Sequence, residues 1–282
     1  MLTMRALISS FAITSVAAAA AAQTKAVVVD QRMIMETVTG KTDTILSRTV
    51  TSKERYRVDY ISSTAPTAPI FRPGLTELMM TRDSDMTIIF IDSARKIYAQ
   101  MKPSSVMSSA RFTGVAMKFE STGDSATMDS IGPGPTIAGH KTLHFRMRSG
   151  SRMTMTMFGE TSVRATAVTT DFYVAPDLAS DSQEPDSARA KSTSARLRSM
   201  TRAMPGAEAM AEQAAKVTKR LAKCGTTLKT VTETTATTAA GARTQHMSLE
   251  TLNYENKVVS DSLFSIPAGF KKVGLMDLIS PF

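Results

Sequence analysis

The chain has 282 residues and a formal net charge of +9 at pH 7, from 34 Lys and Arg against 25 Asp and Glu. The basic residues are scattered and are not interleaved with aromatic residues, which argues against a nucleic-acid partner. In an exported protein the positive charge fits contact with anionic lipid headgroups or with acidic polymers, and a solvated surface is its simplest interpretation. The single cysteine, Cys224, cannot form an internal disulfide, so the fold must be stabilised by packing alone.

The first 22 residues have the layout of a secretory signal peptide. Arg5 supplies a positive charge, an apolar run follows from Ala6 to Ala19, and small residues precede the polar Gln23. The apolar run is shorter than the ~20 residues that a membrane-spanning helix needs. We therefore expect cleavage after Ala22 and a periplasmic or secreted product, rather than an uncleaved membrane anchor.

From Gln23 onward the sequence has the pattern of many antiparallel strands. Short runs rich in Thr, Val, Met and Ser alternate in polarity and are separated by polar turns. Asp92 is well placed to open a tight turn through Ser93, Ala94 and Arg95. We expect strands at 24–38, 42–52, 54–61, 76–83, 86–92, 96–101, 114–122, 125–131, 140–149, 152–158, 162–176, 226–236 and 243–256, followed by an ending segment at 258–273.

The strand pattern breaks between residues 181 and 224, where a helical insertion is predicted. A weakly amphipathic helix is expected at 186–203 and a second helix at 205–224. The second has an apolar stripe at three- and four-residue spacing, and Gly225 follows as a C-terminal cap. The stripe consists of Met210, Ala214, Val217, Leu221 and Cys224. Such an insertion most simply covers one open side of the sheet.

Two of the three histidines, His140 and His144, raise the question of a metal or catalytic site. On a strand their Cα atoms lie about 13 Å apart, too far to share an ion. Strand alternation places both histidines on the face opposite Leu143, Phe145 and Met147. A Gly-x-Ser-x-Gly motif is absent, and Cys224 lies on the helix stripe, where a thiol is usually inert. We therefore expect no catalytic residue, no metal and no cofactor, with a hydrolase that uses His140 or His144 as an open alternative.

Four segments together resemble a known family. They are MTIIFIDSARKIYAQM (86–101), PTIAGHKTLHFRM (135–147), VTTDFYVAPDL (168–178) and DSLFSIPAGFKKV (261–273). In this order they resemble an uncharacterised bacterial exported domain family related to the periplasmic lipoprotein carriers and outer-membrane lipoprotein-sorting proteins. The resemblance covers most of residues 24 to 273 and is weakest over 181–224. The arginine with which carriers latch their helical lid has no assignable position here.

This resemblance implies a mainly β (α+β) fold, a curved and incomplete antiparallel β-barrel with helices over its concave face. Carriers of this shape hold acyl chains or other hydrophobic ligands between sheet and helices. We expect one half-barrel domain at 23–282 with the insertion at about 181–224, ending in a loosely docked tail, DLISPF (277–282).

The favoured function is a non-enzymatic envelope protein that binds a lipid, a lipid-modified protein or another hydrophobic ligand. The helix stripe would form the lid of the site, and strand residues of 140–149 would form part of its floor. The alternative is a structural or interaction module of the envelope with a filled core. The expected ligand-binding residues are Met210, Ala214, Val217, Leu221, Leu143, Phe145 and Met147.

The signal-peptide prediction can be checked on the exported protein. Because small residues lie directly before Gln23, the mature N-terminus should be Gln23. N-terminal sequencing or an intact mass of protein from the periplasmic or culture fraction measures this. Recovery of the chain in the membrane fraction with residues 1–22 attached would show the uncleaved anchor instead.

Overall fold

The structure is a computed structural model that describes residues 22–36, 40–52, 55–65, 72–82, 85–102, 115–121, 126–157, 160–178 and 207–279. The predicted signal peptide up to residue 21, and the helix predicted at 186–203, lie outside the described residues.

Thirteen strands, together with two α-helices, form the described part of the chain. The helices are α3 (Ala207–Cys224) and α4 (Leu275–Ile279), and two short 3-10 helices are η3 (Pro176–Leu178) and η4 (Asp261–Phe264). The strands are β1 (Gln23–Glu36), β2 (Thr42–Ser52), β3 (Arg55–Ser63), β4 (Leu75–Arg82), β5 (Asp85–Asp92), β6 (Ile97–Met101), β7 (Val115–Ser121), β8 (Thr127–Pro133), β9 (Leu143–Met157), β10 (Glu160–Ala175), β11 (Thr226–Thr238), β12 (Gly241–Ser260) and β13 (Lys271–Lys272).

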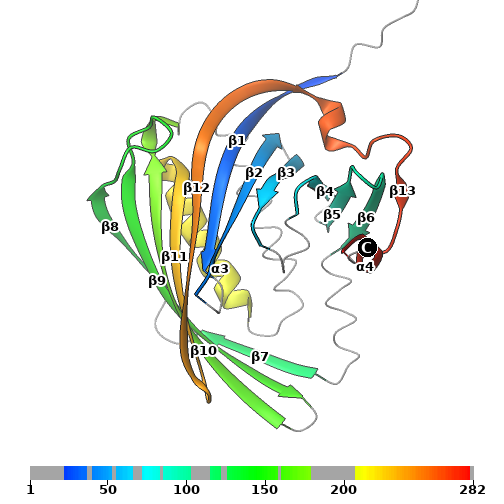
Figure 1. The fold of residues 1–282 in the computed structure, drawn as a ribbon. Helices are drawn as coiled ribbons and strands as arrows, with labels where there is room; N and C mark the ends of the chain where they lie inside the picture. Colours follow the sequence, from blue (N-terminus) through cyan, green and yellow to red (C-terminus); the bar gives the residue numbers. More distant parts are fainter. Residues whose placement is uncertain are drawn as a thin grey trace, which may run out of the picture.

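The strands form one open, strongly curved sheet (Figure 1). Their order is β13-β6-β5-β4-β3-β2-β1-β12-β11-β10-β9-β7, and β8 also pairs with β9. Every pairing is antiparallel except the short parallel pairing of β13 with β6. The helix α3 lies inside the curve of the sheet. The expected fold class, an incomplete antiparallel barrel with helices over its concave face, is confirmed.

The two faces of the sheet differ in chemistry because side chains alternate along each strand. We call the side that α3 and α4 cover the inner face and the opposite side the outer face. The inner face buries apolar side chains such as Ile45, Val58 and Phe90. The outer face carries charged pairs between neighbouring strands. These pairs include Arg48–Asp30, Arg32–Glu250, Lys229–Glu250, Arg146–Asp171 and Arg148–Asp129.

The outer face has apolar areas where the chain after β12 crosses it. Phe264 of η4 packs on Ala26, Val28 and Val50, and the Arg55 guanidinium lies 4.7 Å from the centre of the Phe264 ring. Further on, Ile266 and Phe270 pack against Leu78, Ile89 and Ile91. The segment from η4 to β13 therefore crosses the outer face from the centre of the sheet to its β6 edge and covers these apolar areas.

The turns and ends of the predicted elements have identifiable physical causes. The Asp92 carboxylate accepts a hydrogen bond from the Arg95 backbone N–H at 3.0 Å, as expected for the turn between β5 and β6. Helix α3 ends at the predicted cap, where the Gly225 N–H donates to the Leu221 carbonyl at 3.1 Å. Gly225 has a φ of +138°, which L side chains rarely adopt.

Two sequence expectations differ from the structure. The strands expected at 140–149 and 152–158 form one continuous strand, β9, because pairing with β10 continues through Ser149, Gly150 and Ser151. The strand starts at Leu143, so His140 lies before it in a tight turn in which Ala138 and Gly139 have positive φ values. The expected loose tail is also wrong for the residues that the structure describes: residues 275–279 form α4, and Leu278 is completely buried, while residues 280–282 lie outside the described part.

We expect Gly225→Ala to lower the free energy of unfolding by about 3 kcal/mol. A Cβ at this position would lie 2.2 Å from the Ala175 carbonyl oxygen, in addition to the strain of the backbone conformation. Gly241→Ala is the matched control, since its φ is +114° but no atom lies within 4 Å of the added Cβ. It should cost only about 1 kcal/mol, as backbone strain alone predicts. Equal losses in urea denaturation would contradict this account.

Candidate functional site

The candidate site begins where α3 meets the inner face. Leu221 of α3 packs against Phe145 of β9 and Val174 of β10, all three of them buried. Val217 and Cys224, one turn away on the same side of the helix, pack on this cluster and are partly buried. The contact fixes the C-terminal half of α3 on the sheet and defines which strand residues lie beneath the helix.

The register of the sheet extends this contact into a row across six strands. The row runs along the inner face from Phe145 of β9 to Ile45 of β2, and its members are mostly apolar. Its ends are buried, and its central members are partly buried. We call it the apolar row. Its members are Phe145, Phe172, Thr230, Leu249, Met33 and Ile45.

The next row on the inner face lies two residues further along each strand and consists mainly of methionine and threonine side chains. The Thr170 and Thr232 hydroxyl oxygens lie 3.3 Å apart, in hydrogen-bond contact. Met247 is 40% exposed although it lies on the face that buries the core. We call this the methionine row. Its members are Met147, Thr170, Thr232, Met247, Met35 and Asp43.

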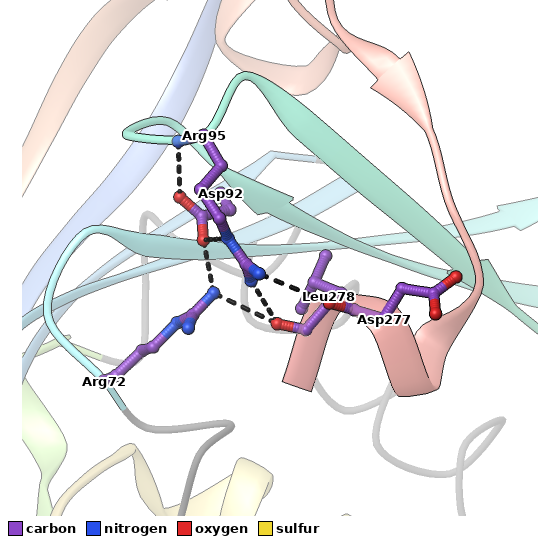
Figure 2. A network of polar contacts seen from close by, with 5 residues as sticks. All are labelled: Arg72, Asp92, Arg95, Asp277 and Leu278. Atoms are coloured by element: carbon purple, nitrogen blue, oxygen red, sulfur yellow. Dashed lines mark hydrogen bonds and ion pairs between the residues drawn. The ribbon is translucent and has the colours of Figure 1, made fainter. Parts of the chain in front are cut away.

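At its other end, over β3 to β6, the inner face is covered by α4 instead of α3. There Leu278 of α4 is fully buried among Ile45, Tyr60, Leu75 and other inner-face residues. A polar network holds α4 in place (Figure 2). Arg72 and Arg95 both donate hydrogen bonds to the Leu278 carbonyl, and Arg95 also donates to the Asp277 carbonyl at 3.2 Å. These guanidinium groups satisfy carbonyls at the C-terminal end of the helix.

Asp92 is the centre of this network. Its carboxylate is buried and accepts hydrogen bonds from Arg72 and from the Arg95 side chain, the latter at 2.7 Å. Burial raises the pKa of the Asp92 carboxyl, but the Arg95 hydrogen bonds and the charges of Arg72 and Arg95 outweigh burial. The pKa of this carboxyl therefore lies below its ordinary value. The ionised form is the one that orients both arginines toward α4.

The histidines lie away from the apolar row. The register places His144 on the outer face with Arg146, Asp171 and Tyr173, as predicted for a residue next to Phe145. The Asp171 carboxylate lies 2.8 Å from His144 Nε2 and accepts a 2.7 Å hydrogen bond from Arg146 Nε, while the His144 ring stacks on Tyr173. The Arg146 hydrogen bond and, to a smaller extent, His144 outweigh burial and lower the pKa of the Asp171 carboxyl.

His140 has a separate partner. Its Nδ1 lies 2.6 Å from an Asp177 carboxylate oxygen, and its ring meets the edge of Tyr254. Each of the two histidines is thus paired with its own carboxylate from a neighbouring segment. The His144–Asp171 pair joins β9 to β10, and the His140–Asp177 pair joins the turn before β9 to η3. Both pairs therefore have a structural role.

The structure brings some of the predicted ligand-binding residues together. Phe145, Val217 and Leu221 share one cluster, and Met147 lies in the adjacent row of the same face. Leu143 shares this face by register but is 38% exposed. Met210 and Ala214 belong to α3, and their side chains lie outside the described part of the structure. Ligand binding by these seven residues stays a prediction.

Sequence reasoning missed Phe172 and Val174 of β10, which pack in the same cluster as Leu221. Their alternation in VTTDFYVAP predicts a shared strand face. The pairing of β10 with β9, which sets both residues beside Phe145, is a long-range property that no local pattern encodes.

Neither a metal cluster nor a membrane-spanning helix is found among the described residues. No three His, Cys, Asp or Glu side chains there are grouped so that they could hold a metal ion. Within the same residues, no helix has both the length and the apolar character to cross a bilayer.

No protein-family model and no curated protein sequence matches the chain. Similar solved structures include PNGF-II, with 10% identity and a TM-score of 0.32 over 91% of this chain, which spans 33% of that protein. A DUF1329 family protein from Desulfovibrio piger has 8% identity and a TM-score of 0.31, covering 86% of this chain and 90% of that one. A LolA superfamily protein from Nitrosomonas europaea has 10% identity and a TM-score of 0.27, covering 85% and 90%.

We expect Asp92→Asn to destabilise the protein by about 2 kcal/mol at pH 7, because two arginines lose their buried carboxylate. A carboxyl whose pKa is lowered by folding stabilises the protein above its unfolded pKa, about 3.9, and this contribution disappears as the pH falls through the lower folded pKa. The difference between wild type and variant should therefore shrink below about pH 4.

Urea denaturation between pH 7 and pH 3 measures this effect. Asp129→Asn is the control, since Asp129 pairs with Arg148 on the surface, where both side chains are more than half exposed. It should cost less than about 0.5 kcal/mol at any pH. An Asp92→Asn penalty that is as large at pH 3 as at pH 7 would refute the role of the ionised carboxylate.

Proposed function

We propose that this protein is an exported envelope protein that binds a lipid or another hydrophobic ligand between its inner face and α3, without catalysing a reaction. The signal-like N-terminus supports export, and the positive net charge supports contact with an anionic membrane surface. The proposed site comprises the apolar row, the methionine row and the C-terminal half of α3.

One observation carries this proposal, the partial exposure of the methionine row. The inner face is buried at both ends, beneath Leu221 of α3 and beneath Leu278 of α4. Between these ends Met247 is 40% exposed, and Met35 and Met147 are only partly buried. Apolar surface held inside a curved sheet and beside a helix is typical of a hydrophobic binding site.

The residue types in this region also suit a ligand of variable shape. Methionine side chains are flexible and polarisable and adapt to irregular apolar groups. The hydroxyl groups of the neighbouring Thr170 and Thr232 share one hydrogen bond, so this contact uses one of their two hydroxyl protons. An acyl chain placed along this row would therefore meet few unsatisfied polar groups.

The second candidate remains a structural or interaction module of the envelope, with the inner face fully packed in solution. The two candidates differ in one measurable property, which is uptake of an amphiphile. Native mass spectrometry of protein purified without detergent should detect a bound lipid or fatty acid under the first proposal and the bare chain under the second.

We expect Met247→Asp to weaken binding of the neutral fluorescent probe N-phenyl-naphthylamine by about tenfold, because a carboxylate in the methionine row would be desolvated by the probe. Val163→Asp is the matched control. Val163 is 37% exposed on β10, and its register places it on the outer face with Asp171. It should leave probe affinity unchanged.

Fluorescence titration measures both affinities, and urea denaturation confirms that both variants are folded. Failure of the wild-type protein to bind the probe, together with a bare chain in native mass spectrometry, would favour the filled-core module. Equal effects of the two variants would show that the probe binds elsewhere.

A further inference from the structure

Beyond the methionine row, the inner face of β10 to β12 becomes more polar toward the tips of these strands. The next row by register contains Ser149, Val168, Thr234 and Gln245, and the row after it contains Ser151, Thr166, Ala236 and Arg243. Arg164 lies two residues beyond Thr166 on β10, opposite Met153. Along the inner face, buried apolar side chains are thus followed by hydroxyl groups and then by Arg164 and Arg243.

These two arginines are exposed and have no hydrogen bond or ion pair with any described residue. They differ in this from Arg32, Arg48 and Arg146, which pair with carboxylates on the outer face. A guanidinium left without a carboxylate partner is available for a carboxylate or phosphate group, which it can bind with two parallel hydrogen bonds.

The spacing of the two arginines allows them to act on one group. Arg164 and Arg243 lie two strands apart and are offset by two residues along the strands. Strand spacings of about 4.8 Å and a rise of about 3.3 Å per residue place their Cα atoms about 12 Å apart. Two long side chains that share a face at this separation can converge on a single anion between them.

Among the described strand residues, the inner-face carboxylates nearest to the two arginines are Asp43 and Glu160. Asp43 is on β2, in the methionine row, and is separated from Arg243 by two strand spacings and four residues. Glu160 is on β10, four residues from Arg164, which corresponds to about 13 Å along the strand. Neither carboxylate neutralises the positive end of the face by direct pairing, so the two arginines keep their charge for an external anion.

We propose that Arg164 and Arg243 bind the headgroup of the ligand, so that the ligand is an anionic amphiphile whose chain lies along the methionine row. This inference rests on the proposed function and adds the chemical class of the ligand. The anionic group is a carboxylate or a phosphate attached to an acyl chain. The hydroxyls of Ser151 and Thr166 lie in the same row as Arg243 and supply further hydrogen-bond donors.

The test compares two ligands with the same chain. Palmitate and monopalmitoylglycerol are used to displace N-phenyl-naphthylamine from the purified protein, and palmitate should bind about tenfold more tightly than the neutral ester. In the double variant Arg164→Gln, Arg243→Gln this preference should disappear while the affinity for monopalmitoylglycerol is kept. Arg152→Gln is the control, because Arg152 is exposed and its register places it on the outer face.

The outcomes separate this inference from the proposed function. If neither the probe nor monopalmitoylglycerol binds, the proposed function itself fails. If both ligands bind equally well, or if the double variant keeps the preference for palmitate, the headgroup assignment is overturned. If inorganic phosphate displaces the probe as effectively as palmitate, the arginines form a site for free anions, and the amphiphile assignment is wrong.

Discussion

The structure depends on the antiparallel register from β9 through β12 to β2, because this register decides which residues share a face. A slip of one residue in any of these pairings would move Phe172 or Leu249 to the outer face and bring charged side chains inside. The register also changes at defined places. Shifts between Asp30 and Gln31 and between Tyr173 and Val174 add a residue to one strand, which bends the sheet and increases its twist.

The separation of the two faces follows from this constraint. The outer face pairs its charges across strands and needs no cover over much of its area, while the inner face needs helices to exclude water. The two helices do this in different ways. Helix α3 uses an apolar stripe, whereas α4 has only five residues and relies on Leu278 and on two arginines from distant parts of the chain. The surface between them is where the proposed ligand would lie.

The sequence predicted the individual strands and helices better than the contacts between them. The strand predicted at 42–52 coincides with β2, and the helix stripe correctly identified Val217 and Leu221 as residues that pack on the sheet. Alternation and three- to four-residue spacing are local signals, and both are strong in these segments. They also placed His144 on the face opposite Phe145.

The remaining features depend on residues far apart in the chain. Burial of the last helix comes from Arg72, Arg95 and the inner face, and five residues are too few to show a helical period. To predict that Phe172 belongs to the cluster beneath α3, one must know the β9–β10 register. To predict that Arg164 and Arg243 have no carboxylate partner among the described residues, one must know where the nearby carboxylates lie. Such pairings are decided by the packed sheet as a whole.

The pairing of β1 with β12 has a consequence for the order of folding. It joins the first strand of the described chain to β12, its last long strand, since Gln23 lies opposite Ser260, and it connects the β2–β6 half of the sheet to the β7–β11 half. Each half can form from neighbouring hairpins, but the seam between them requires closure of a loop longer than 200 residues, as the separation of Gln23 and Ser260 shows. During synthesis the sheet therefore stays in two unjoined parts until nearly the whole chain has been made.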